Sequence, residues 1–115
     1  MADQTDVDDF LREVKGAILC HPVMWVKRLG AKSHGSGLNL TRKQMLERIE
    51  RLTSRNYYRG PFDFEGAEVY SFGDEIEGIE AYVKLGLRQV GGKTVKYLEI
   101  HSFHKADRTI NYAFN

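Results

Sequence analysis

The sequence has little of what would place the protein in several broad classes. It has 115 residues with a single cysteine, Cys20, so an intrachain disulfide framework is excluded and a reducing compartment is expected. The formal net charge is only +1, so bulk charge indicates no partner. No apolar run approaches a membrane span, and the acidic start MADQTDVDD has no apolar stretch typical of a secretory signal. We therefore expect one cytoplasmic domain, residues 1–115, without a membrane partner.

The charges are segregated along the chain although they nearly cancel. Residues 27–59 hold nine lysines and arginines against two glutamates, whereas residues 60–83 hold seven carboxylates and no lysine or arginine. Two solvated faces of opposite charge would account for this pattern. A basic lobe that faces the phosphates of a nucleic acid would also account for it. On its own, the pattern favours the solvated faces.

Two segments of the first half have the spacing of amphipathic helices. Residues 7–19 place apolar side chains at helical intervals, and Thr41 and Gln44 have the spacing of a capping box at the start of a second helix, residues 40–52. Residues 23–29, which contain Trp25, fit either a short strand or an extended linker. We expect Trp25 and Cys20 to be buried, and His34 to be a solvated residue of the polar, glycine-rich loop that follows.

The last half has the pattern of strands, at residues 67–72, 79–88 and 94–103. A two-residue turn centred on Gly91-Gly92 would pair Tyr82 with His101 and Val83 with Ile100. A further turn is expected at Gly60-Pro61. The predicted class is therefore α+β, with two N-terminal helices packed on a C-terminal antiparallel sheet.

His101 and His104, near the end of the last predicted strand, are the candidates for chemistry. Zinc needs three or four ligands in a local pattern, and no CxxC or HxxxH occurs, so we expect no metal site. Histidine suits proton transfer near neutral pH. RNA cleavage without a metal needs a group acting on the 2′-hydroxyl, an acid for the leaving 5′-oxygen and cations for the charged phosphorane. An ordinary solvated strand face would carry the same residue types and remains the alternative.

Three segments, taken in order, resemble the MqsR-like toxins of bacterial toxin–antitoxin systems. They are LTRKQMLERIERLTSRNYYRGP, VYSFGDEIEGIEAYVKLGLR and SFHKAD, and the similarity runs from about Leu38 to Asp107. These toxins look like relatives of the RelE-type mRNA interferases. The resemblance implies a RelE/microbial-RNase-like fold and metal-independent cleavage of single-stranded mRNA without a cofactor. It also implies a cognate antitoxin as the protein partner, and it says nothing of the oligomeric state.

The resemblance also assigns catalytic roles to three positions. Arg59 matches the basic residue that follows an aromatic pair, Tyr82 matches a strand tyrosine of the active site, and His104 matches the acid/base or charge-stabilising group after Ser-Phe. Counted strictly from Leu98 and Ile100, His104 falls on the aliphatic side of its strand. It can join Tyr82 only if the strand ends or bulges near residues 102–103.

Three further residues are candidates for substrate binding. Lys84 lies beside Tyr82 on the same strand face, and His101 faces Tyr82 in the predicted register, although family members usually have an aliphatic residue at that position. Tyr58, with its neighbour Tyr57, could stack RNA bases or could pack between helix and sheet.

One departure from the family favours a different function. Family members often have a glutamine before the first sheet strand, where this chain has Ala67. A non-catalytic nucleic-acid- or protein-binding module on the same fold is therefore the second hypothesis, and a structural α+β domain is the third.

Overall fold

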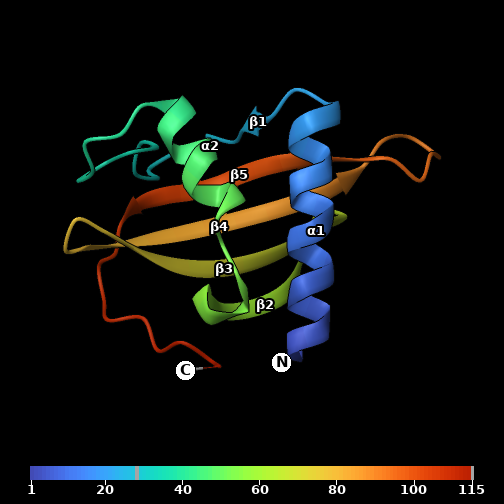
Figure 1. The fold of residues 1–115 in the computed structure, drawn as a ribbon. Coiled ribbons are helices and arrows are strands. Elements are labelled where there is room, and N and C mark those ends of the chain that lie inside the picture. The colour runs from blue at the N-terminus through green and yellow to red at the C-terminus, as the bar shows by residue number, and fades with distance from the viewer. Residues whose placement is uncertain (28, 115) are drawn as a thin grey trace.

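The computed structural model describes residues 1–27 and 29–114. The first half forms helix α1 (Gln4–Cys20), strand β1 (Met24–Trp25), helix α2 (Arg42–Glu50) and the short 3-10 turn η1 (Ser54–Asn56). Four longer strands follow: β2 (Tyr57–Phe64), β3 (Ala67–Ile76), β4 (Ile79–Gln89) and β5 (Lys96–Lys105) (Figure 1). The predicted α+β class is confirmed. None of the helices described is both long and apolar enough to cross a membrane.

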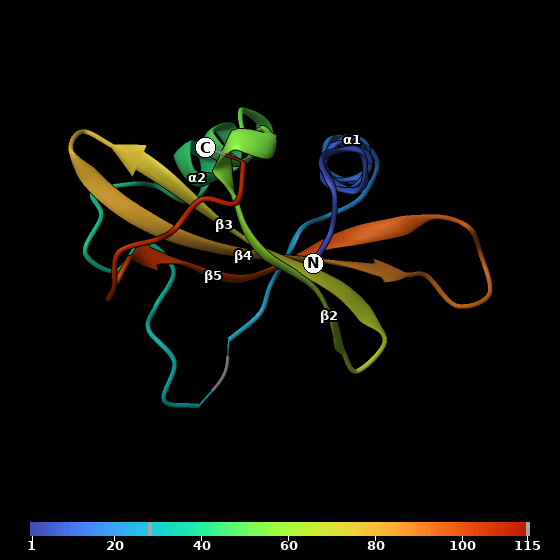
Figure 2. The ribbon, with the colours of Figure 1, turned by 90° about the horizontal axis from the view of Figure 1, so that it is seen from below.

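The five strands form one sheet in the order β1-β5-β4-β3-β2. Strands β2 to β5 are antiparallel, but β1 pairs with β5 in parallel, so the prediction of a purely antiparallel sheet is wrong. The sequence was compatible with either a strand or a linker at Met24 and Trp25. These two residues form a short strand that pairs with the outer edge of β5. Figure 2 shows both helices on the same side of the sheet, and we call this side the helix side.

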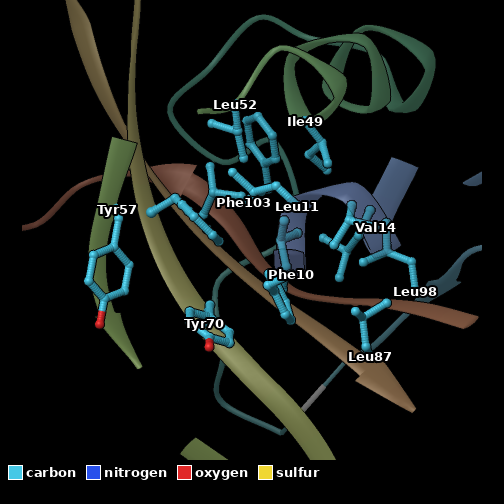
Figure 3. Packing of buried hydrophobic residues seen from close by; sticks show 14 of the residues in the cluster. Phe10, Leu11, Val14, Ile49, Leu52, Tyr57, Tyr70, Leu87, Leu98 and Phe103 are labelled. Atoms are coloured by element: carbon cyan, nitrogen blue, oxygen red, sulfur yellow. The ribbon is translucent and has the colours of Figure 1, made fainter. Parts of the chain in front are cut away.

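The helix side holds the main hydrophobic core. Helix α1 begins after Asp3, whose side chain accepts a hydrogen bond from the Asp6 amide, and it buries the apolar stripe that its spacing predicts. The Phe10 ring lies 4.1 Å from that of Tyr70 and 6.1 Å from that of Phe72, measured between ring centroids. Helix α2 has the predicted capping box of Thr41 and Gln44. Its buried residues join the same cluster, part of which is drawn in Figure 3.

The register of the last hairpin differs from the prediction. The chain turns through residues 91–94, and the Val90 amide donates a hydrogen bond to the Val95 carbonyl. A turn of only two residues at Gly91-Gly92 is therefore wrong, and the pairing shifts: Leu85 faces Ile100, and Leu87 faces Leu98.

A β-bulge in β5 decides which side of the sheet its last residues face. Leu85 pairs with Ile100, but its neighbour Lys84 pairs with Ser102, so His101 is the extra residue. The extra residue reverses the alternation of side chains. Phe103 returns to the helix side opposite Val83, and His104 lies on the other side opposite Tyr82. The bulge that the sequence required for His104 to join Tyr82 is present, next to the predicted position.

The turn predicted at Gly60-Pro61 is also wrong, because both residues lie inside β2. Gly60-Pro61 instead coincides with shifts in the register between β2 and β3, which fall between Tyr57 and Phe62. The φ of Gly60 is +122°, and a Cβ at this position would lie 2.8 Å from the Val69 carbonyl oxygen. Glycine is therefore required at this point, where the backbone of β2 lies unusually close to that of its neighbour β3.

Candidate functional site

Polar side chains line up across the sheet on the side away from the helices. One row of paired residues holds Arg59 on β2, Ser71 on β3, Lys84 on β4 and Ser102 on β5. In the next row, Gly73 pairs with Tyr82, and Tyr82 pairs with His104. Because neighbouring strands are only about 4.8 Å apart, these two rows bring cations, hydroxyls and an imidazole onto one small area.

The Tyr82 and His104 rings lie 5.6 Å apart between centroids. The hydroxyl groups of Tyr82 and Ser71 are hydrogen-bonded at 2.9 Å, which fixes the position of the phenol oxygen. The His104 Nδ1 atom lies 2.8 Å from the Lys105 carbonyl oxygen. Because a carbonyl only accepts, Nδ1 carries the hydrogen, and Nε2 is the nitrogen of the neutral ring that can take up a proton.

Arg59 is held by an aromatic neighbour. Its guanidinium carbon lies 4.6 Å from the centroid of the Tyr58 ring, a cation–π contact that orients the planar group. Tyr57 has a different role, since it is fully buried and its hydroxyl donates to the Gly60 carbonyl. Of the two tyrosines, Tyr57 therefore packs the core, and Tyr58 is the one that remains at the surface of the sheet.

The three residues expected to be catalytic line one pocket. This pocket has a volume of about 290 Å³, and its walls are Tyr58, Arg59, Tyr82, His104 and residues 106–110. A second pocket of about 480 Å³ shares Tyr58 and Arg59 but is otherwise lined by Met1, Tyr57, residues 60–62 and Asn111. Only the smaller pocket contains both proton-transfer candidates, so we call it the candidate site. Lys84 lies on the same sheet face, outside its lining.

The chain after β5 forms a wall of the candidate site that sequence reasoning missed. The Ala106 amide donates to the Glu80 carbonyl, the Tyr112 hydroxyl donates to the Glu80 carboxylate at 3.0 Å, and the Ala113 amide donates to the Tyr57 carbonyl. Burial and the Glu80 carboxylate both raise the pKa of Tyr112, so its phenol stays a neutral donor. Gly73 was the available signal, because a Cβ there would lie 2.5 Å from the Tyr112 hydroxyl oxygen.

His101 does not belong to the candidate site. It is 4% exposed and packs edge-on against the Phe64 ring, with 5.1 Å between centroids. Its Nε2 atom lies 3.1 Å from the Glu99 carboxylate, which Arg88 also contacts at 2.7 Å. The prediction that His101 faces Tyr82 is wrong because the wider hairpin turn and the bulge move it along β4. Its burial also leaves no room for the predicted contact with substrate.

Glu99 is ionised in this network. Burial alone would raise its pKa, but the hydrogen bond and charge of Arg88, together with His101, outweigh burial and lower the pKa. The resulting ion pair lies beneath Phe64, where Gly86 leaves space for the imidazole: a Cβ at Gly86 would lie 2.9 Å from Nε2 of His101. His101 is thus part of a small second core on the sheet face away from the helices.

Replacing His101 with alanine is expected to lower the free energy of unfolding by about 2–4 kcal/mol, because it opens a cavity under Phe64 and removes a partner of buried Glu99. Urea denaturation measures this loss. The half-buried His104 is the matched control, and His104→Ala should change the unfolding free energy by at most about 0.5 kcal/mol. Equal stability losses in the two variants would contradict the placement of His101.

The expected basic lobe is divided by the fold. Arg48 of α2 donates hydrogen bonds to both carboxylate oxygens of Asp74 at 2.9 Å and to the Glu75 carbonyl, and its hydrogen bond to Asp74 raises the pKa of Arg48. Helix α2 therefore neutralises part of the acidic segment on the helix side, away from the candidate site. Arg28, another of the basic residues, lies outside the described part of the chain.

Two other expectations concern metal and thiol chemistry. Across residues 1–27 and 29–114, no group of three or more histidine, cysteine, aspartate or glutamate side chains could hold a metal ion. Cys20, expected to be buried, is exposed because it falls off the apolar stripe at the last residue of α1.

The chain matches no family model, no curated protein and no solved structure. The resemblance to MqsR-like toxins therefore stays a prediction. A function for the protein has to be argued from the geometry of its own residues.

Proposed function

We propose that the protein is a metal-independent endoribonuclease, an mRNA interferase toxin of the MqsR-like and RelE-related class. The observation that carries the proposal is that Arg59, Tyr82 and His104 line one pocket although they come from three different strands. A RelE/microbial-RNase-like fold is part of the same proposal. It is supported by the antiparallel strands β2 to β5, which have both helices on one side and the polar rows on the other.

Proton transfer in this mechanism belongs to His104 and Tyr82. The Nε2 atom of His104 takes the proton of a ribose 2′-hydroxyl, or delivers a proton to the leaving 5′-oxygen, while Nδ1 stays bonded to the Lys105 carbonyl. Tyr82, held by Ser71, orients the substrate or serves as the second proton-transfer group. The 2′-oxygen bonds to phosphorus as the bond to the 5′-oxygen breaks. The products are a 2′,3′-cyclic phosphate and a 5′-hydroxyl end.

Charge stabilisation belongs to Arg59. A planar guanidinium can donate two hydrogen bonds to phosphate oxygens, and the Tyr58 ring beneath it preorganises the group. Lys84, two residues from Tyr82 on the same face, adds positive potential. Cleavage of RNA in the cytoplasm would need to be held in check, so we further propose that a cognate antitoxin binds over the candidate site.

Excess chelator is expected to leave cleavage of single-stranded RNA by the purified protein unchanged, because Arg59 and Lys84 supply the positive charge that a metal would otherwise supply. The measurement is the rate of RNA cleavage with and without chelator. Loss of cleavage that one divalent metal restores would overturn the metal-independent mechanism.

The alternative of a non-catalytic binding module rests on Ala67, which stands where family members often have glutamine. The position of Ala67 in the fold tests whether this difference affects the candidate site. Ala67 is fully buried and pairs with Phe64, four residues along β3 from Ser71, a distance of about 13 Å in a strand. It does not line the candidate site. The missing glutamine therefore leaves the groups of that pocket in place, and the enzyme remains the better supported proposal. Binding of RNA without any cleavage would identify the alternative.

A further inference from the structure

A separate pocket lies beside β1, at the opposite edge of the sheet from β2. It has a volume of about 250 Å³ and is lined by Trp25, Lys27, Lys32, Ser33, His34 and Arg42; we call it the tryptophan pocket. Among the described residues, its lining holds three cationic side chains and no carboxylate, and one of the three, Lys32, forms an ion pair with Asp107. It is smaller than the roughly 300–1,000 Å³ typical of sites for drug-sized ligands. Its size and charge suit one phosphate group with the sugar attached to it.

The Trp25 ring holds two other side chains of this pocket, Arg42 and His34, in place. The Arg42 guanidinium carbon lies 4.9 Å from the centroid of the Trp25 ring, and the His34 ring meets the indole edge-on at 5.3 Å. Because the indole orients the Arg42 guanidinium, Arg42 loses less side-chain freedom when it binds an anion. Arg42 is otherwise exposed, so it can bind a ligand from solvent without opening the fold.

His34 carries a polar atom with no hydrogen-bond partner among the described residues. Its Nε2 lies 2.8 Å from the Val26 carbonyl, so Nε2 donates, and Nδ1 of the neutral ring is an acceptor. This Nδ1 is buried and unpaired within the described part of the chain. Buried polar atoms are normally paired. Because this atom is buried, a ribose hydroxyl in the pocket can donate the missing hydrogen bond only when the imidazole turns toward the pocket. The prediction that His34 is a solvated loop residue is wrong.

The tryptophan pocket is joined to the candidate site. Lys32 of its lining forms an ion pair with Asp107, which lines the candidate site. The loop between the two pockets is fastened to β5, because the Gly35 amide donates to the Phe103 carbonyl and the Lys105 amide donates to the Ser36 carbonyl. These bonds flank His104 in the chain. The two linings therefore meet at the Lys32–Asp107 ion pair, and an RNA strand with its scissile phosphate at His104 would extend along this loop toward the second pocket.

We infer that the tryptophan pocket binds one ribonucleotide unit, with its phosphate on Lys27 and Arg42, beside the Lys32–Asp107 ion pair, and a ribose hydroxyl on His34. Its place as a subsite for the RNA strand rests on the proposed function. Binding of a single nucleotide does not, because the cations and the unpaired acceptor are present whether or not the protein cleaves RNA.

The test is a titration with adenosine 5′-monophosphate, followed by fluorescence. Trp25 is the only tryptophan in the chain, so the signal reports on this pocket alone. The mononucleotide has no phosphodiester bond to cut, and excitation at the red edge of the tryptophan band avoids its absorption. We expect a saturable change in emission with adenosine 5′-monophosphate. The dissociation constant should be larger for 2′-deoxyadenosine 5′-monophosphate, and adenosine should give no saturation.

Arg42→Gln is expected to weaken binding of the nucleotide about tenfold, the loss of one charge-assisted hydrogen bond. Lys43→Gln is the matched control, because Lys43 is the next residue of α2, is exposed and does not line the pocket. It should change the dissociation constant less than about twofold.

No saturable response to the mononucleotide, or equal losses in Arg42→Gln and Lys43→Gln, would overturn the inference. So would saturable, Arg42-dependent binding of an acidic peptide in place of the nucleotide, since the pocket would then be a protein interface. RNA cleavage without mononucleotide binding would contradict this inference and leave the proposed function intact. Mononucleotide binding without RNA cleavage would support the nucleotide pocket and contradict the proposed function.

Discussion

Replacing His104 with alanine is expected to lower the single-turnover rate of RNA cleavage by about 10²- to 10⁴-fold, the usual contribution of a general acid or base. His104 is the imidazole of the candidate site, its tautomer is fixed by the Lys105 carbonyl, and its ring lies 5.6 Å from that of Tyr82. The loss should appear in the rate of the bound complex, because Arg59, Lys84 and Arg108 still supply the positive charge that attracts the polyanion.

His101→Ala is the matched control for this loss. The two histidines are three residues apart, but one is buried beneath Phe64 and the other lines the candidate site. Assayed at a temperature where both variants are folded, His101→Ala should cleave at nearly the wild-type rate. If His101→Ala is the inactive variant and His104→Ala is active, the assignment of the acid–base group is wrong.

Replacing Arg59 with alanine is expected to cost about 2–4 kcal/mol of transition-state stabilisation, the scale for one preorganised charge-stabilising donor. This corresponds to a rate of cleavage roughly 30- to 900-fold lower. Arg59→Lys keeps the charge but loses the planar fork and its stacking on Tyr58, so it should retain part of the activity. Binding of RNA should fall less than the rate, because Lys84 and Arg108 remain at or beside the pocket.

The measurement is single-turnover cleavage together with RNA binding at matched salt, since phosphate contacts depend on salt. Arg55→Ala is the charge-matched control, because Arg55 is an exposed arginine in η1, close in sequence, that does not line the candidate site. If Arg59→Ala weakens binding and leaves the bound-state rate unchanged, Arg59 is only part of the electrostatic surface.

The local parts of the fold could be predicted because their signals are short in range. The apolar spacing of residues 7–19 marks the buried stripe of α1, and the pair Thr41 and Gln44 marks the start of α2. The predicted start of the first helix was a few residues late, because Asp3 and Asp6 form the cap one turn earlier. Such caps and stripes depend on neighbours within about one helical turn, which the sequence contains.

The pairing of strands was harder because it depends on the length of one turn. Gly91-Gly92 is a strong signal for a two-residue turn, but the chain uses residues 91–94, and every pair in the hairpin moves. The position of His104 was recovered only because its expected role demanded a bulge, which the fold places at His101. A change of one residue in a strand turns each later side chain to the other face.

Other parts of the site had almost no local signal. Residues 106–114 have no regular spacing, yet Ile110 lines the candidate site, and Ile110 and Tyr112 pack over Gly73. The tryptophan pocket combines β1, a loop and the first turn of α2, which are brought together only by the fold. The charge pattern was visible, but the pairing of Arg48 with Asp74 across the core was not. Contacts between distant segments of this kind decide which charges face a ligand.

The central claim is that the pocket of Arg59, Tyr82 and His104 cleaves RNA by attack of the 2′-hydroxyl. The most direct measurement mixes labelled single-stranded RNA with excess wild-type protein in the presence of chelator, and reads the bound fraction, the cut fraction and the chemistry of the new ends together. The account predicts cut RNA with 5′-hydroxyl and 2′,3′-cyclic phosphate ends. RNA that is bound but stays intact, or products with 5′-phosphate ends, would contradict it.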